Sequence, residues 1–284
     1  MAEQAEIAAL YTLIDDPDEE VFGAVSDRIV NYGSIIIPTL EHWWETTPNE
    51  QVQSRIEHLI HQLQFRDLRR NFTDWKHAAR PELLTGALLT ASFHYPELAT
   101  ATVISETEKL RRNIWLELNN YLTPLEQINV FHNVLYGYFG LRSIPKDEGK
   151  PSHFMLNKII TEKKGTQVGN GLLYLLLCEQ LDLPVRLIQL PKQFILAYLK
   201  NDSNEAHASA AFFMDPTGGQ IYTHRDIETY FKRINEPLEP HYLTPLSNAG
   251  TIATVLTALA GVYDAAKEPH KIAELKELIA FLKS

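Results

Sequence analysis

Three polar residues within the segment 164–219 could form one chemical site. The segment reads as a buried helix that is entered through Gly165 and begins at Gln167, followed by strands that end near Gln193 and Asp215. In folds that use a cysteine nucleophile, such a helix carries the thiol at its start, and the strands carry a histidine and a carboxylate. An amide neither ionises nor transfers protons as imidazole does. These residue types therefore predict hydrogen bonding rather than nucleophilic catalysis.

The chain has a single cysteine, Cys178, inside the predicted helix. It lies about 16 Å along the helix axis from Gln167, at 1.5 Å per residue. A free cysteine among apolar residues behaves as a small buried hydrophobe, so we expect core packing rather than catalysis. One cysteine also excludes an intramolecular disulfide and a cysteine-based zinc site. Thr166 and Ser152 carry hydroxyl groups, but no adjacent base is identifiable for either of them.

The histidines do not assemble a recognisable metal site. His58 and His61 are spaced to share one helix face, but a zinc site needs a third ligand that the sequence does not identify. His207 and His224 flank the strand that ends at Asp215, and we expect them in a surface loop and at a helix start. We therefore predict no metal and no cofactor.

Residues 1–78 are predicted to form a helical N-terminal unit. The sequence PDEEV at 17–21 returns as PNEQV at 48–52, and apolar residues at helical spacing follow both copies. Paired helices that repeat at such intervals resemble a HEAT-type solenoid. The alternative is an ordinary helical bundle in which acidic helix starts recur by chance.

Residues 79–236 are predicted to combine helices with an antiparallel meander, which makes an α+β fold in which helices predominate. Helical patterns continue to Tyr138; a polar loop is then expected over 140–151 and a short helix over 153–164. Beyond the buried helix, which Pro184 ends, strands are expected over 185–190, 194–199, 210–214 and 220–223. A helix from 224 to 234 follows, and residues 237–284 predict a TPR-like helical hairpin.

Composition limits the classes of partner. The formal charge of −10 argues against a broad nucleic-acid surface and against docking on anionic lipid. No apolar run approaches the roughly 20 residues that a membrane-spanning helix needs. The first ten residues lack the pattern of a secretory signal. We therefore expect a cytoplasmic protein that binds neither nucleic acid nor membranes.

Several short motifs occur in a shared order: LNKII at 156–160, Gly165, the leucine-rich helix, LPV at 183–185, LPKQF at 190–194, and DP with GG over 215–219. Together they resemble the bacterial SirB-type transglutaminase-like family over roughly residues 80–284. The helical N-terminal unit also looks like the HEAT-like leader of some members. The resemblance implies a papain-like core made of a buried helix and a meander.

In the transglutaminase-like superfamily, a cysteine attacks an acyl carbon, a histidine is its base and an aspartate orients the histidine. The resemblance places Gln167 at the cysteine position, Gln193 at the histidine position and Asp215 at the aspartate position. SirB-type members commonly lack the cysteine but often keep the histidine, so this chain departs further from the enzymes than its family requires. The three residues are then candidates for binding a ligand, with no catalytic residue expected.

Three hypotheses about function remain open. The first is a catalytically inactive transglutaminase-like protein that acts as a binding or scaffolding module for a protein or peptide. The second is a hydrolase or acyl transferase with a non-standard nucleophile. The third is an adaptor whose cleft is filled by side chains, so that only the helical surface matters. The first is the preferred prediction, because amides occupy two of the three catalytic positions.

Overall fold

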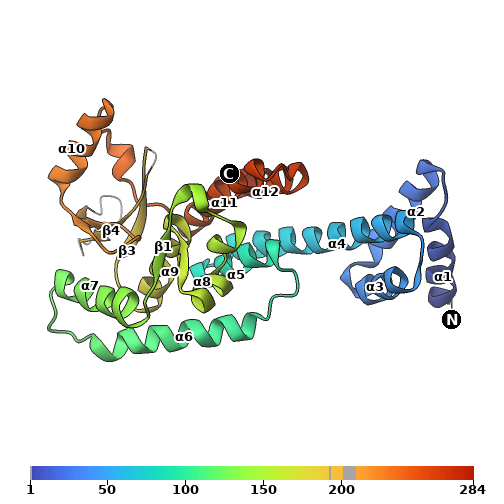
Figure 1. The fold of residues 1–284 in the computed structure, drawn as a ribbon, viewed down its shortest axis with the longest axis horizontal. Coiled ribbons are helices and arrows are strands. Elements are labelled where there is room, and N and C mark those ends of the chain that lie inside the picture. The colour runs from blue at the N-terminus through green and yellow to red at the C-terminus, as the bar shows by residue number, and fades with distance from the viewer. Residues whose placement is uncertain (1, 192, 201–208) are drawn as a thin grey trace. The chain divides into compact units, whose positions relative to one another are not determined.

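The computed structural model describes residues 2–191, 193–200 and 209–284. The chain divides into two compact units, residues 1–73 and 74–284 (Figure 1). Helices predominate and strands form two small sheets, so the predicted α+β class is confirmed. Within the described part of the chain, no helix has the length and apolarity that crossing a membrane requires. The predicted boundaries after residues 78 and 236 stay predictions.

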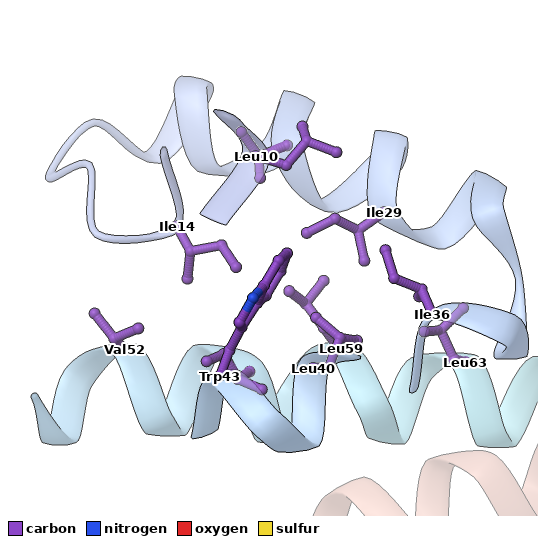
Figure 2. Close-up of a cluster of buried hydrophobic side chains, with 11 residues drawn as sticks. Leu10, Ile14, Ile29, Ile36, Leu40, Trp43, Val52, Leu59 and Leu63 are labelled. Atoms are coloured by element: carbon purple, nitrogen blue, oxygen red, sulfur yellow. The ribbon is translucent and has the colours of Figure 1, made fainter. Parts of the chain in front are cut away.

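The described residues of the first unit form helices and no strands. Its elements are α1 (Ala2–Ile14), α2 (Glu19–Tyr32), the short 3₁₀ helix η1 (Ser34–Ile36), α3 (Ile37–Thr46) and the beginning of α4 (Glu50–Lys76). Their apolar stripes meet around Trp43, and Ile14, Ile29 and Leu40 in this core are fully buried (Figure 2). The apolar spacing seen in the sequence after both repeated segments therefore identified buried positions of α2 and α4, including Val25, Ile29 and Ile56.

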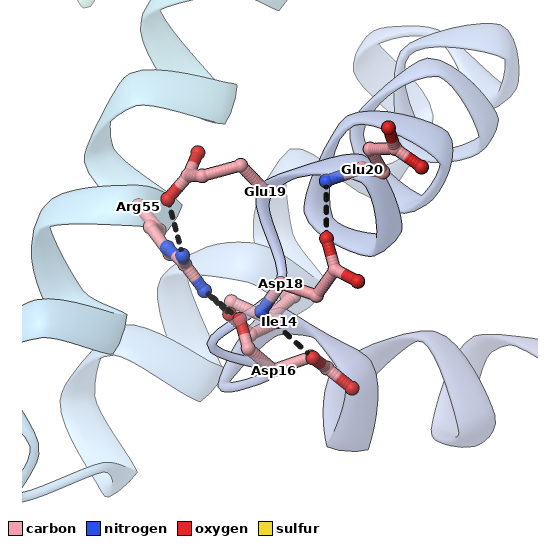
Figure 3. A network of polar contacts seen from close by, with 6 residues as sticks. All are labelled: Ile14, Asp16, Asp18, Glu19, Glu20 and Arg55. Atoms are coloured by element: carbon pink, nitrogen blue, oxygen red, sulfur yellow. Dashed lines mark hydrogen bonds and ion pairs between the residues drawn. The ribbon is translucent and has the colours of Figure 1, made fainter.

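A single arginine organises the acidic turn between α1 and α2 (Figure 3). Arg55 on α4 donates to the backbone oxygens of Ile14 and Asp16, both at 2.7 Å, and pairs with Glu19 at 2.9 Å. Asp18 caps α2 by accepting from the Glu20 amide at 2.9 Å. Arg55 thus holds the end of α1, while the acidic side chains of this turn begin α2 and pair with the arginine.

The second unit surrounds one buried helix, α9 (Gln167–Gln180). Before it come α5 (Leu83–His94), α6 (Thr100–Glu117), α7 (Pro124–His132), the π-helix η2 (Asn133–Tyr138), the 3₁₀ helices η3 (Lys146–Glu148) and η4 (Pro151–Phe154), and α8 (Leu156–Glu162). After it come α10 (His224–Ile234), η6 (Pro240–Leu243), α11 (Asn248–Ala265) and α12 (Pro269–Lys283). Leu172 to Cys178 of α9 are all buried, as their apolar run predicts.

The larger sheet is antiparallel, with the order β3 (Val185–Leu190), β4 (Gln193–Leu199), β5 (Ala210–Met214), β6 (Ile221–Tyr222). One face packs on α9, where the ring of Phe194 lies so close to Gly171 that a side chain there would clash. The other face packs on α10, with Ile195 and Phe213 against Phe231. The meander predicted from the sequence is confirmed.

A second, two-stranded sheet contradicts the predicted loop and helix. β1 (Arg142–Ile144) lies inside the expected loop, and β2 (Lys164–Thr166) follows α8 where the helix was expected to continue. The two strands pair in parallel, with Arg142 opposite Lys164. Parallel partners are distant in the chain, and three-residue strands carry no readable alternation, so local sequence patterns did not reveal them.

Candidate functional site

The start of α9 is held in place by close backbone contacts. Thr166 caps the helix by accepting from the Gly169 amide at 3.2 Å. The carbonyl oxygen of His153 lies only 2.4 Å from the point where a Cβ on Gly169 would be, and 3.1 Å from that of Gly165. Side chains at these two positions would therefore push η4 away from the helix. The glycines let the chain enter α9 beside a buried backbone segment.

Two of the three predicted site residues meet at this helix start. The Nε2 of Gln167, the first residue of α9, donates to Oδ1 of Asp215 at 3.3 Å. The same carboxylate accepts from the backbone amide of Thr217 at 2.9 Å and from its hydroxyl at 2.5 Å. Asp215 follows β5, so the buried helix and the sheet bring together groups that are 48 residues apart. Their role in binding a ligand stays a prediction.

Gln193 does not join them. It is the exposed first residue of β4, where it pairs with Leu190 of β3. Side chains alternate along a strand, so Gln193 shares the α10 side of the sheet with Ile195, while Phe194 points to α9. Among the described residues, no hydrogen bond links Gln193 to Gln167 or Asp215. The predicted three-residue cluster is therefore assembled only in part.

The remaining reactive groups lie elsewhere. Cys178 is fully buried, and burial raises the pKa of its thiol well above its usual range. His224 is exposed, with its ring edge against Phe213 at 5.1 Å between centroids. His207 lies outside the described residues. The Thr166 hydroxyl is occupied by its capping bond and by a contact of 3.5 Å to the His153 carbonyl, which leaves it without a base.

The structure adds residues that the sequence did not single out. The π-helix η2 follows α7, and these two elements place His132 and Tyr136 beside the segment after Asp215. His132 Nε2 lies 2.9 Å from the hydroxyl of Tyr174 on α9, and the Tyr136 hydroxyl donates to the Pro216 carbonyl at 3.0 Å. π-Helical turns occur frequently at functional sites.

Gly219 is a sequence signal for the close approach of His132 to the segment after Asp215. Its backbone has φ of +76°, and a Cβ there would lie 2.6 Å from Nδ1 of His132. Both observations require glycine at this position, because a side chain would be strained and would displace the imidazole. The Gly218-Gly219 pair was visible in the sequence, but the partner that it accommodates was not.

Electrostatics make the groups around Asp215 neutral. Burial lowers the pKa of His132 to about 4. The pKa of Tyr136 is raised, mainly by burial and then by the Asp215 carboxylate, and burial raises that of Tyr174 well above its usual range. An imidazole that stays unprotonated, two phenols and an amide can hold hydrogen bonds. They do not supply an activated nucleophile.

The lowered pKa of His132 predicts a pH-dependent stability. An unfolded histidine titrates near pH 6.5, so the unfolded chain takes up a proton on acidification before the folded chain does. The stabilisation is complete above about pH 6.5 and is lost as the pH falls toward 4. Between about pH 7 and pH 4.5, wild type should lose about 2 kcal/mol more unfolding free energy than His132→Gln, allowing for partial exposure. Urea titrations at both pH values measure this.

Glutamine is the matched replacement because its amide can keep the hydrogen bond to Tyr174 but does not titrate. All other ionisable groups, including His94 and His153, whose pKa values burial also lowers, contribute equally to both proteins. Equal pH slopes for wild type and His132→Gln would show that His132 is not held neutral by the fold.

Comparison with known proteins agrees with this architecture. No curated protein and no solved structure shows a significant match to the chain. The family model of the transglutaminase-like superfamily matches residues 101–257, which is more than half of the chain and includes α9 and all four strands of the larger sheet. A buried helix that begins beside the carboxylate following the third strand, within this matched segment, is the arrangement expected from the sequence. The chain belongs to the transglutaminase-like superfamily.

Proposed function

We propose that this protein is a catalytically inactive transglutaminase-like protein of the SirB type that works as a binding module. The observation that carries the proposal is the hydrogen bond between Gln167 and Asp215 at the start of α9. In an enzyme of this superfamily a cysteine thiolate would stand where this amide is. The amide holds the carboxylate but does not attack an acyl carbon.

The helix start gives the proposed module its binding chemistry. The N-terminus of α9 presents backbone amides and the positive end of the helix dipole, and both favour a carbonyl or carboxylate oxygen of a ligand. Gln167 and Asp215 are half-buried, so solvent reaches them. We infer that the ligand is a protein or peptide rather than a nucleic acid or a membrane, and that the protein works in the cytoplasm. HEAT-like and TPR-like helical flanks would enlarge the contact surface.

Turnover measurements test the proposal. Purified protein and Gln167→Ala are incubated with activated esters, thioesters, peptide amides and a glutamine peptide with a labelled amine, and product is followed by mass spectrometry. We expect both proteins to match the buffer blank. Turnover lost in Gln167→Ala would mean that this end of α9 is catalytic. Turnover retained in Gln167→Ala would favour a hydrolase or acyl transferase with its nucleophile elsewhere. Either result overturns the proposal.

A further inference from the structure

The segment from β1 to β2 has an unusual charge for this protein. Residues 142–164 contain six Lys and Arg residues and three Asp and Glu residues, whereas the whole chain carries −10. Six minus three gives this segment a formal charge of +3. A local excess of positive charge in an acidic protein attracts an anionic partner to one place.

Part of this charge is concentrated on paired strands. Arg142 and Lys164 lie directly opposite each other in the parallel register of β1 and β2. Like charges directly opposite one another across paired strands are destabilising, so the stability of the sheet does not explain why Arg142 and Lys164 occupy these positions. Lys164 has one acidic neighbour, Glu162, at 3.3 Å. Among the described residues, no carboxylate forms an ion pair with Arg142.

A third cation completes the cluster. The Lys150 amide donates to Nδ1 of the buried His153 at 3.2 Å, and the charges of Lys164 and Lys150 both contribute to lowering the pKa of His153, after the larger effect of burial. Lys150 and Lys164 therefore both lie near this imidazole, together with Glu162, whose charge has the opposite effect on the pKa of His153. We name Arg142, Lys150 and Lys164 the β1 cationic edge.

The free edge of β1 is formed by the main-chain groups of Ser143, because the Arg142 amide donates to the Lys163 carbonyl at 2.9 Å and the Arg142 carbonyl accepts from Nδ2 of Asn170 at 3.0 Å. β1 and β2 form a two-stranded sheet, and within the described part of the chain neither strand pairs with a third. β2 is covered, since Gly165 and Thr166 are buried, whereas β1 has an exposed Arg142 and half-buried Ser143 and Ile144. An accessible free strand edge can accept an extended peptide through main-chain hydrogen bonds.

We propose that the β1 cationic edge binds an extended, acidic segment of a partner protein, which pairs with Ser143 at the free edge of β1. Main-chain hydrogen bonds would supply the alignment, and the three cations would select glutamate and aspartate side chains. The acidic turn of this chain at Asp15–Glu20 is a poor occupant, because it is folded and its Asp18 and Glu19 carboxylates are already bonded. The proposal stands independently of whether Gln167 contacts a ligand.

Binding of defined peptides to the full-length protein tests this surface. The probe is a fluorescein-labelled peptide of alternating glutamate and valine, followed by fluorescence anisotropy at low salt. Matched probes replace glutamate with lysine, or carry N-methyl groups on alternate residues, which remove strand hydrogen bonds. We expect the acidic peptide to bind at least about tenfold more tightly than either matched probe, and salt to weaken that binding.

Charge-reversed variants locate the site. Arg142→Glu with Lys164→Glu should weaken acidic-peptide binding at least about tenfold, and Lys150→Glu, which lies outside both strands, should weaken it several-fold. The control is Lys232→Glu with Lys276→Glu, which reverses two exposed lysines on α10 and α12. This control should bind as wild type does. The Lys150→Glu arm remains informative if the double variant unfolds.

Three outcomes would overturn the proposal. Lysine on a free edge also discourages uncontrolled strand pairing, and that role alone predicts equal, weak binding of acidic and basic peptides. Full binding of the N-methylated peptide would remove strand addition as the mode. Concentration-dependent self-association of the protein in sedimentation experiments, lost in the Arg142→Glu and Lys164→Glu protein, would make a second copy the occupant.

Discussion

A Gln167→Cys protein should react with iodoacetamide at neutral pH roughly 100-fold faster than wild type. The helix start lowers the pKa of the new thiol, whereas burial raises the pKa of Cys178, the thiol that wild type already has. The new thiol would lie half-exposed at the first position of α9, at the positive end of the helix dipole. The only thiol of wild type, Cys178, is fully buried within the same helix, and its pKa is raised. Mass spectrometry of the alkylated peptide gives both rates.

One control separates helix-start activation from simple exposure. Thr161→Cys places a thiol at an exposed position in the last turn of α8, where the dipole disfavours the thiolate. Its alkylation should reach half of its maximal rate at a higher pH than that of Gln167→Cys. Equal pH profiles for the two thiols would show that the start of α9 no longer supports a nucleophile.

Adding Gln193→His to Gln167→Cys tests the second catalytic position. Gln193 is exposed and shares the α10 side of the sheet, so an imidazole there should raise the alkylation rate by less than about threefold. A much larger gain, with a bell-shaped pH profile, would mean that the β3–β4 hairpin moves Gln193 to the helix start. That result would also strengthen the residue-by-residue assignment to the enzyme family.

Much of the second unit followed from local sequence signals. Gly165 and Pro184 bracket α9, and the three longer strands lie within one residue of the predicted ranges. Glycine or proline residues mark the boundaries of these elements and long apolar runs fill them, and both signals can be recognised in a single sequence. β1 and β2 are short and depend on each other, so neither shows a pattern by itself.

The candidate site was harder to predict because its contacts are distant in the chain. His132 and Tyr174 are 42 residues apart, and Tyr136 and Pro216 are 80 residues apart. No periodicity within one element connects such residues. Gln193 shows a different limitation, since the order of motifs aligned it with a catalytic position while strand register decided which face it occupies.

Glu179→Ala should cost about 3 kcal/mol of unfolding free energy, because one carboxylate joins three helices through charged hydrogen bonds. Its Oε2 accepts from the Leu83 amide at the start of α5 at 2.8 Å. Its Oε1 accepts from Nδ2 of Asn248 at the start of α11 at 2.6 Å. Denaturant unfolding followed by circular dichroism measures the loss.

The position of Glu179 on α9 indicates that its hydrogen bonds to Leu83 and Asn248 are the reason for a carboxylate there. It lies in the last turn of α9, where a negative charge opposes the helix dipole. It also serves α5 in place of a local cap, since Glu82 at the N-cap makes no side-chain capping bond. The unfavourable position of Glu179 at the end of α9 is therefore offset, because its carboxylate accepts from an α5 amide that would otherwise have no partner within its helix.

Glu179→Gln separates shape from charge. The amide is the same size and keeps one acceptor oxygen, so it should cost about 1 kcal/mol, against about 3 kcal/mol for alanine. Asn248→Ala and the Glu179→Ala, Asn248→Ala pair complete a double-mutant cycle, in which the combined loss should fall short of the sum of the single losses. Strict additivity would mean that the two residues stabilise the fold separately. Coupling would establish that α9, besides presenting Gln167 at one end, fastens α5 and α11 to the core at the other.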